Sequence, residues 1–511
     1  MLSIIKSFGL TGINGYLVNV EVDLNQGLPN YDLVGLVGTS TKESKERVRS
    51  AIKNSGFKYP ILKITINLAP ADTKKEGPLY DLPIAIGILS ASEQVNIASA
   101  QRYLMIGELG LNGDLKKVNG VLPILISARQ LGFKKIILPK DNEKEASFIE
   151  GLEVYPASCL SEVVSFLNGN ITIEPIKLND FSTVKNSKKY HTDFKYIKGQ
   201  ENAKRALEIA AAGGHNVLMI GPPGSGKTML AKAFPTILSD LTFAEALEVT
   251  KIHSIAGVLD MNEGIITTRP FRSPHHTSTT LALTGGGRLA KPGEISLAHT
   301  GVLFLDEMPE YSRNSIETLR QPLEDGTITI SRVESTVEYP ASFTLIASMN
   351  PCPCGNYGSS EKECKCTPQQ IHKYLNKLSG PIMDRIDMHI EVDNVKYNDL
   401  RDETLSESSC DIKARVDKAR EIQIERFKNS DNVCNAKMND QELKKYCKID
   451  DQSSAILESA FKKLHLSARA YNRILKVART IADLDNSENI QLDHLMEAIS
   501  YRSLDNKYWE Y

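Results

Sequence analysis

One stretch near the middle of the chain restricts the fold more than any other: NVLMIGPPGSGKT, residues 216–228. Residues 216–220 are predicted to form a short buried strand, and MLAKAF (229–234) is predicted to form a helix. A glycine-rich turn between strand and helix makes G-x-x-x-x-G-K-[ST] a phosphate-binding loop instead of a plain structural turn. The loop residues are Gly221, Pro222, Pro223, Gly224, Ser225, Gly226, Lys227 and Thr228. The sequence therefore predicts an α/β fold that binds a nucleoside triphosphate.

A second apolar strand carries the acidic groups that such a loop needs. Residues 301–305 (GVLFL) end at Asp306 and Glu307. Asp306 is expected to hold Mg²⁺ together with Thr228, while Lys227 contacts the β- and γ-phosphates. Glu307 is expected to orient and deprotonate the attacking water. An acidic pair can also cap the next helix, so this interpretation depends on the presence of the phosphate loop.

A third apolar strand, residues 343–348, ends just before Asn350. The Asn350 amide is expected to lie beside the γ-phosphate as a polar sensor. Asn-Pro is also an ordinary turn signal, so this hypothesis depends on the other two motifs.

Length and composition place the chain among soluble proteins with several domains. It has 511 residues, too many for one core, with 41% hydrophobic and 24% charged residues. The formal net charge of −2 means that any binding to nucleic acid must use a local basic surface. No apolar run reaches the length of a membrane span, and MLSIIKSFGL lacks a signal-peptide core, so a cytoplasmic protein is expected.

Periodicity divides the chain into four parts. Residues 1–172 mix strand and helix patterns, and residues 173–193 are polar, lysine-containing and read as a linker, although their basic run is also able to touch DNA phosphates. Residues 194–397 contain the nucleotide motifs. From 398 to 511 the chain is amphipathic and helical, which predicts an all-α lid.

Four cysteines lie close together in sequence, just after Asn350. They are Cys352, Cys354, Cys364 and Cys366, two C-x-C pairs separated by nine residues. Four thiolates can hold Zn²⁺ in a tetrahedral structural site that leaves no position open for catalysis. Because C-x-C fits this geometry less well than C-x-x-C, free thiols remain the alternative.

The first unit resembles the peptidase domain of Lon in its magnesium-chelatase (ChlI-type) version, which implies a ribosomal S5 domain 2-like α+β fold. The resemblance lies in residues 66–89 and 106–139, in that order. Lon's nucleophilic serine follows Gly-Pro, but here Lys75-Glu76-Gly77-Pro78 is followed by Leu79, and no lysine occurs near 122–126. Leucine and isoleucine cannot act as nucleophile or base, so an inactive peptidase fold is expected.

Nearly the whole chain resembles the ComM/YifB family of magnesium-chelatase-like AAA+ ATPases. The segments that carry this resemblance are PFRSPHHTSTT, GEISLAHTGVLFLDEMPE, SMNPCPCGNYG and LSGPIMDRIDMHI. The family implies a hexameric ring that binds ATP and Mg²⁺ and moves DNA, with branch migration in natural transformation as its role. Nothing in the sequence supplies a porphyrin site. A protein-remodelling or chelatase-like ATPase is the alternative function, and an ATP-dependent protease is disfavoured by Leu79.

The resemblance also assigns roles outside the phosphate loop. Tyr196 and Ile197 would border the adenine. Arg385 matches the arginine finger, which reaches the γ-phosphate of a neighbouring subunit, unless it only pairs with a nearby aspartate. Arg469 would be the second sensor from the lid, with Arg473 as the alternative.

Two further segments of the ATPase unit are expected to contact the substrate. Residues 268–301, with His275, His276 and Arg288, would form either a loop that faces the ring pore or a plain surface loop. Two alternating strands around Arg332 predict the hairpin with which related motors move their substrate.

Overall fold

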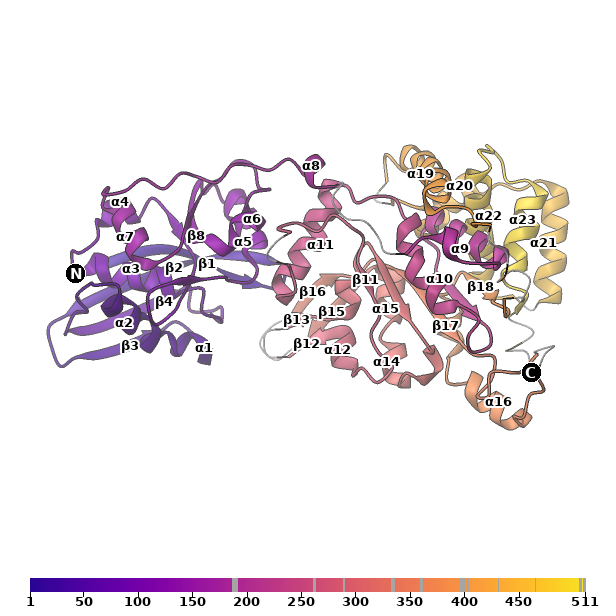
Figure 1. Cartoon of the computed structure of the whole chain (residues 1–511), viewed down its shortest axis with the longest axis horizontal. Helices are drawn as coiled ribbons and strands as arrows, with labels where there is room; N and C mark the ends of the chain where they lie inside the picture. Colours follow the sequence, from indigo (N-terminus) through magenta and orange to yellow (C-terminus); the bar gives the residue numbers. More distant parts are fainter. Residues whose placement is uncertain are drawn as a thin grey trace.

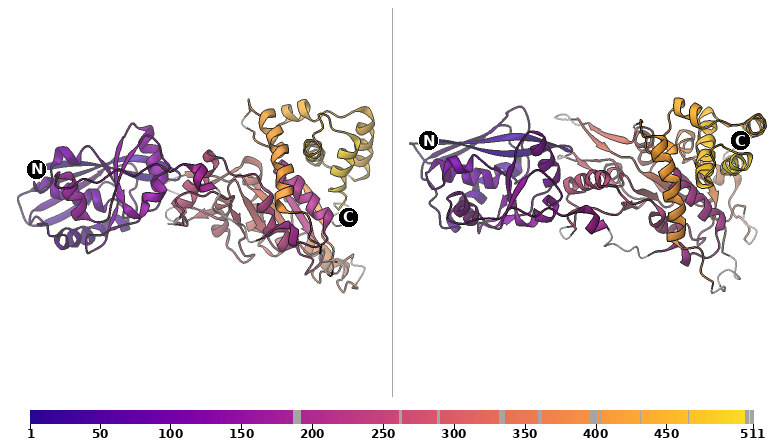
Figure 2. Two further views of the ribbon diagram at one scale, coloured as in Figure 1. Left: turned by 45° about the horizontal axis from the view of Figure 1, so that its top comes forward. Right: turned by 90° about the horizontal axis from the view of Figure 1, so that it is seen from above.

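The protein is elongated, with the N-terminal unit at one end and the C-terminal helices at the other (Figures 1 and 2). The computed structural model describes residues 1–185, 192–260, 263–287, 290–331, 336–358, 362–395, 401, 404–430, 432–464, 466–504 and 508. The predicted residues Arg288 and Arg332 lie outside this part of the chain. None of the described helices is long and apolar enough to cross a membrane.

The N-terminal unit is built on a seven-stranded mixed sheet with the order β3-β4-β2-β1-β5-β8-β9. The strands are β1 (Leu2–Thr11), β2 (Asn14–Asn25), β3 (Asn30–Val34), β4 (Lys63–Ala69), β5 (Leu104–Met105), β8 (Lys135–Pro139) and β9 (Glu153–Ala157). The main helices are α2 (Ser44–Asn54), α3 (Asp81–Ala91), α5 (Val121–Gln130) and α7 (Leu160–Leu167). Burial alternates along β2 because Val18, Val20 and Val22 face the core, whereas α3 is buried on all sides.

The ATPase unit contains a five-stranded parallel sheet with the order β11-β14-β17-β10-β18. Its strands are β10 (Val217–Ile220), β11 (Phe271–Arg272), β14 (Val302–Leu305), β17 (Thr344–Met349) and β18 (Met388–Glu391). Both faces are covered, so the strands read as unbroken apolar runs. Val217 and Met219 belong to one hydrophobic core, and Leu218 and Ile220 belong to the other.

Helices and a hairpin complete this unit. The helices that flank the nucleotide motifs are α9 (Glu201–Gly213), α10 (Lys227–Ala233) and α11 (Phe243–Ala256). The predicted hairpin forms from β15 (Thr327–Ser331) and β16 (Thr336–Pro340), paired antiparallel. Two short helices, α14 (Arg313–Glu317) and α15 (Arg320–Asp325), follow the acidic pair.

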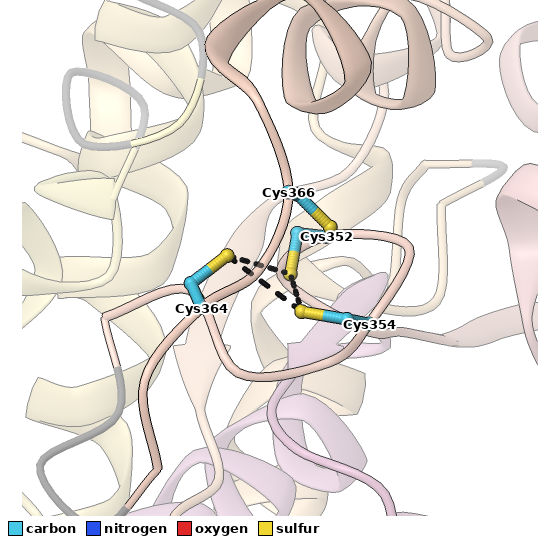
Figure 3. A group of neighbouring side chains, drawn as sticks. All are labelled: Cys352, Cys354, Cys364 and Cys366. Carbon is cyan, nitrogen blue, oxygen red and sulfur yellow. Dashed lines mark hydrogen bonds between the residues drawn. The ribbon is translucent and has the colours of Figure 1, made fainter.

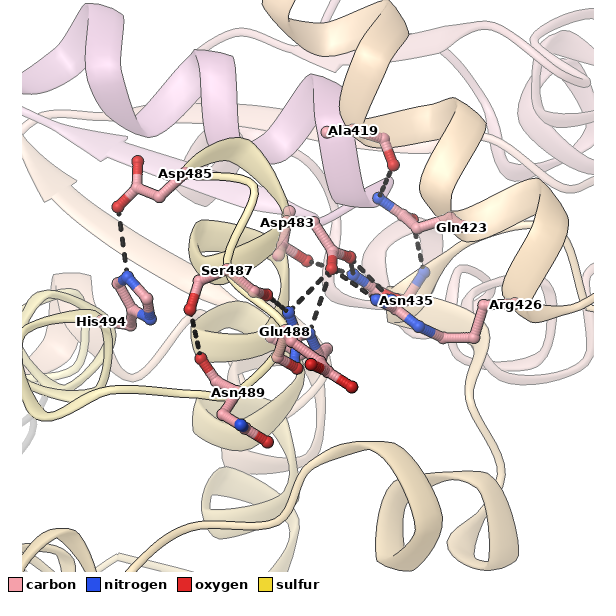
Figure 4. A network of polar contacts seen from close by, with 12 residues as sticks. Ala419, Gln423, Arg426, Asn435, Asp483, Asp485, Ser487, Glu488, Asn489 and His494 are labelled. Atoms are coloured by element: carbon pink, nitrogen blue, oxygen red, sulfur yellow. Dashed lines mark hydrogen bonds and ion pairs between the residues drawn. The ribbon is translucent and has the colours of Figure 1, made fainter.

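The C-terminal part is helical, as the amphipathic pattern predicted. Its helices are α19 (Ser409–Arg426), α20 (Asp440–Tyr446), α21 (Asp451–Lys463), α22 (Ala468–Leu484) and α23 (Leu492–Ser500). Figure 4 shows how a buried carboxylate, Asp483 on α22, joins this helix to α19 and to Asn435. Asp483 accepts hydrogen bonds from Arg426 on α19, from Asn435 and from Arg479. Breaking such a buried pair costs about 3–5 kcal/mol, which makes Asp483 a central support of the lid.

The N-terminal unit rests on the ATPase unit through specific contacts. Ser254 on α11 receives a hydrogen bond from the Gly120 N–H (3.0 Å) and donates its hydroxyl proton to the buried Glu145. The tip of the β1–β2 hairpin is so close to Val337 of β16 that a Cβ at Gly12 would lie 2.5 Å from it. A cavity of about 220 Å³ lies between the two units and is lined by Leu79 from one and Tyr339 from the other.

The segment 173–193, expected to be a linker, packs against the ATPase unit through Phe181. It includes the short helix α8 (Phe181–Lys185), and the Phe181 ring lies 5.5 Å from that of Phe243 at the start of α11. Residues 186–191, which hold most of the predicted basic run, lie outside the described part of the chain.

Candidate nucleotide site and cysteine cluster

The phosphate loop has the backbone geometry that its glycines predicted. It follows β10, which lies between β17 and β18 in the sheet, and leads directly into α10. Gly224 and Gly226 have φ values of 84° and 93°, which side-chain-bearing residues rarely adopt. A Cβ at Gly221 would lie 2.0 Å from the Val392 carbonyl oxygen, so only glycine fits there. The N–H groups of the turn and of the new helix are available to an anion.

Lys227 lies at the centre of the loop and is 8% exposed. Its Nζ donates to the carbonyl oxygens of Gly221 (2.7 Å) and Pro222 (2.8 Å), and Asn350 Oδ1 is 3.4 Å away. Burial lowers the pKa of Lys227 to about 8, although Asp306 and Glu307 act in the opposite direction. The structure thus brings the predicted sensor Asn350 next to the predicted phosphate-binding lysine.

The predicted magnesium ligands also meet. Thr228 Oγ1 donates to Asp306 Oδ2 at 2.9 Å. Ser348, on β17, donates its hydroxyl proton to the other oxygen of Asp306 and accepts the Glu307 N–H at 3.1 Å. Ser348 was missed by the sequence reasoning, although its position two residues before Asn350 places it on the same strand end. A hydroxyl and a carboxylate are oxygen ligands of the kind that Mg²⁺ prefers.

Glu307 has an unusual backbone conformation. Its φ is 53° and its ψ is 49°, a left-handed geometry that is uncommon for a residue other than glycine. The hydrogen bond from its N–H to Ser348 helps to hold this turn. Its side chain is 53% exposed, and its negative charge is near enough to Lys227 to raise the pKa of that lysine.

The segment predicted to border the adenine lies beside the phosphate loop. Ile197 is 4% exposed, whereas Tyr196 is 60% exposed. Gln200, which sequence reasoning did not select, donates its Nε2 proton to the Ser225 carbonyl at 3.2 Å. This contact joins residues 196–200 to the loop that would hold the phosphates.

Arg385 lies near the start of strand β10, whereas the phosphate loop of the same chain follows the end of that strand. The Arg385 carbonyl oxygen accepts from Asn216 Nδ2 at the start of β10, and the loop begins after the four residues of β10, about 13 Å further along. The Arg385 side chain is 7% exposed, and its guanidinium forms an ion pair with Glu324. It is therefore not placed to act on its own nucleotide.

The two lid arginines also lie near the start of β10. Ser467, which caps α22, lies 3.4 Å from Asp384, and Arg469 is close enough to Glu324 to help lower the pKa of that carboxyl group. Arg473 forms an ion pair with the buried Asp387. The structure brings neither arginine to the phosphate loop of the same chain.

The four cysteines form one cluster, although the two pairs are separated in sequence (Figure 3). Cys352 Sγ is 3.4 Å from that of Cys354 and 3.7 Å from that of Cys364, and all four sulfurs lie within 4.8 Å of one another. A tetrahedral site with Zn–S bonds of about 2.3 Å requires sulfurs about 3.8 Å apart, so the cluster fits zinc. All eight cysteines are free thiols, and no disulfide competes for these four.

The cysteine loop touches the nucleotide site. A Cβ at Gly355 would lie 2.4 Å from Pro223 of the phosphate loop, so the two loops are in close contact. Cys352 also follows Asn350 by only two residues. A metal held here would fix the loop that carries the sensor.

Comparison with known proteins agrees with this geometry. Three family models match the chain. They are described as magnesium chelatase, subunit ChlI (residues 193–400), subunit ChlI of Mg-chelatase (20–142) and magnesium chelatase, subunit ChlI C-terminal (406–502). The competence protein ComM of Haemophilus influenzae is 46% identical over 508 residues, which cover 98% of both chains. The chain belongs to the magnesium-chelatase-like ComM/YifB family.

Two other relatives are similar to the chain, one over nearly its whole length and one over about a third of it. The uncharacterized protein YifB of Escherichia coli is 46% identical over 505 residues, 99% of this chain and 97% of YifB. Lon protease 2 of Bacillus subtilis is 28% identical over 181 residues, 32% of each chain. Membership in the ComM/YifB family, together with the assembled phosphate loop, identifies this chain as an AAA+ ATPase.

Proposed function

We propose that this ATPase forms a hexameric ring that hydrolyses ATP to move DNA in the cytoplasm, with branch migration or helicase activity in recombination or natural transformation. The observation that carries the ring is the position of Arg385, at the edge of the sheet away from its own phosphate loop. An arginine so placed completes a site only when another subunit brings its nucleotide to that edge. ATP supplies the energy, and Mg²⁺ is held by Thr228 and Asp306.

DNA is favoured as the substrate by two observations. A relative of 46% identity over nearly its full length carries the name competence protein. The hairpin of β15 and β16 comes immediately before β17 in the chain, and the family resemblance implies that such a hairpin moves the substrate. The net charge of −2 gives no general attraction to DNA, so binding must come from the loops that a ring brings together.

A protein-remodelling or chelatase-like ATPase is the alternative function. It is favoured by the N-terminal unit, because Leu79 of that unit and Tyr339 of the hairpin line one cavity. On this alternative, a protein partner would stimulate ATP hydrolysis and DNA would not.

We also propose that the cysteine cluster holds a structural Zn²⁺ and that the N-terminal unit has no peptidase activity. The sulfur geometry supports the first proposal. Leu79, 8% exposed and in the place of a nucleophile, supports the second.

The decisive experiment measures ATPase rate alone and with single-stranded, duplex and four-way-junction DNA. Stimulation by DNA, strongest for the branched substrate and lost at high salt, is expected because phosphate contacts are salt-dependent. The same assays with Lys227→Ala protein measure the background rate of contaminating ATPases, which is subtracted. Equal rates with and without all three DNAs, in assembled rings, would reject the DNA motor.

A further inference from the structure

The loop of residues 273–279 covers the catalytic carboxylate. It lies between β11 and the short helix α12 (Thr280–Thr284). His276 Nδ1 is 4.0 Å from Glu307 Oε2, and the imidazole ring is about one-third exposed. The motif PFRSPHHTSTT that contains His276 received only an open interpretation from the sequence, as a pore loop or a surface loop.

Hydrogen bonds at both ends hold this loop over Glu307. The Tyr311 hydroxyl donates to the Pro274 carbonyl, and Thr280 Oγ1 lies 3.2 Å from Ser315 Oγ. Both partners belong to the segment that follows Glu307 in the chain. The His276 ring also packs edge-on against that of Tyr311, at 6.5 Å between centroids. The segment that follows Glu307 in the chain therefore also holds the imidazole of His276 beside the Glu307 carboxylate.

We propose that His276 is the positioning residue of Glu307 and that it couples an exposed substrate loop to ATP hydrolysis. The 4.0 Å contact is longer than a hydrogen bond, and we expect it to shorten to one when ATP is bound. The imidazole N–H then fixes one oxygen of Glu307, and the other oxygen faces the attacking water. Glu307 remains the group that accepts the proton from that water. A misplacement of a catalytic group by about 1 Å can cost about 100-fold in rate, so a residue that only orients the base has a large effect.

The connection from His276 to the surface is short. The five residues of α12 lead from the loop into the two-stranded β12 (Gly285–Gly286) and β13 (Lys291–Pro292). Leu283 is 1% exposed and anchors α12 in the core, whereas Leu281 on the same helix is 52% exposed. A substrate contact that displaces strands β12 and β13 would therefore be passed to α12, which adjoins β12 in the chain, and from α12 to the loop that carries His276. This coupling step rests on the proposed function, because it requires that these strands meet the substrate.

The first test needs no substrate other than ATP. In assembled wild-type and His276→Ala rings, the variant is expected to bind a fluorescent ATP analogue normally, to keep its KM, and to lose about 10- to 100-fold in kcat. His276→Asn, whose amide can donate the same hydrogen bond, is expected to recover part of this loss. His275 is unsuitable as a control, because its ring stacks on that of His276 at 4.1 Å between centroids. Thr277→Ala is the control instead, because Thr277 is exposed and its side chain hydrogen-bonds to His275 within the same loop.

The results separate positioning from a general structural role. A kcat within about two-fold of wild type in His276→Ala would overturn the proposal, as would an equal loss in Thr277→Ala. Weakened ATP binding that matches the rate loss would also overturn it, since the loop would then only support the fold.

A second arm tests the coupling. If DNA stimulates the wild-type rate, His276→Ala is expected to lose that stimulation ratio, and an unchanged ratio would reject the coupling step. If DNA stimulates neither protein, the proposed function fails, while the kcat comparison still decides whether His276 positions Glu307.

Discussion

Thr228 and Asp306 are 78 residues apart in sequence, yet the Thr228 hydroxyl donates a 2.9 Å hydrogen bond to Asp306 Oδ2. The contact joins the start of α10 to the end of β14, and it places two oxygen ligands at the mouth of the phosphate loop. Ser348 fixes the other oxygen of the same carboxylate. The predicted Mg²⁺ ligands thus lie together in the structure, and the role of each can be tested by substitution.

The roles of Lys227 and Glu307 predict two different defects. Lys227→Ala is expected to lose ATP binding, because the buried cation at the phosphates is removed. Glu307→Gln is expected to bind ATP normally but to hydrolyse it at least about 100-fold more slowly, since an amide cannot accept the proton of the attacking water. Equilibrium binding of a fluorescent nucleotide and steady-state turnover separate the two. Near-wild-type turnover by Glu307→Gln would remove Glu307 from the mechanism.

The lowered pKa of Lys227 predicts that ATP affinity depends on pH. In the free protein Lys227 loses its proton above about pH 8, whereas bound phosphates favour the charged form and raise its pKa. Binding therefore takes up a proton above pH 8, and the Kd should rise by up to about tenfold per pH unit. Titrations at pH 7, 8 and 9 in matched ionic strength measure this rise. A Kd that stays constant across the series would contradict the pKa shift.

The position of Arg385 predicts complementation between subunits. Arg385→Ala is expected to bind ATP normally and to hydrolyse it about 10³-fold more slowly, because an arginine supplied in trans stabilises the charge that develops on the γ-phosphate. Mixing it with Lys227→Ala chains should restore activity, since some interfaces then combine an intact Lys227 site with an intact Arg385. Full activity of Arg385→Ala, or no rescue in rings proven to contain both chains, would contradict this mechanism.

The cysteine cluster predicts one tightly held metal per chain. Elemental analysis should find about one zinc, and a strong chelator should lower the Tm, because metal bound to the folded state stabilises it. Cys364→Ser should reduce the zinc content, whereas Cys410→Ser is the control, since Cys410 is exposed and outside the cluster. Metal-free protein in which all four thiols react at once with a thiol reagent would reject the site.

The N-terminal unit is expected not to cleave proteins. Leu79 offers no nucleophile, and α5 contains no lysine to act as a base. Unfolded casein should remain intact in the presence of ATP, and Leu79→Ser alone should not create activity because the base would still be missing. Cleavage that survives repurification and disappears when residues 1–172 are removed would show that this unit has another catalytic residue.

Much of the nucleotide site was readable from the sequence because its parts are local. The phosphate loop needs glycines at fixed spacing, and the acidic pair and Asn350 each follow an apolar strand. Parallel strands bring their carboxyl ends to one edge, so Lys227, Asp306, Glu307 and Asn350 meet there once the order of the sheet is set. The helical C-terminal part was predictable for a similar reason, since amphipathic periodicity is a property of each helix alone.

Tertiary structure alone decided the contacts between segments that are distant in sequence. No local pattern predicts that Ser348 bonds to Asp306, that His276 lies over Glu307, or that Arg385 pairs with Glu324 at the far edge of the sheet. Packing of the two units also decided that Leu79 faces Tyr339. Local spacing determines backbone conformation and residue chemistry, whereas burial and ion pairing depend on which surfaces meet after the chain has folded.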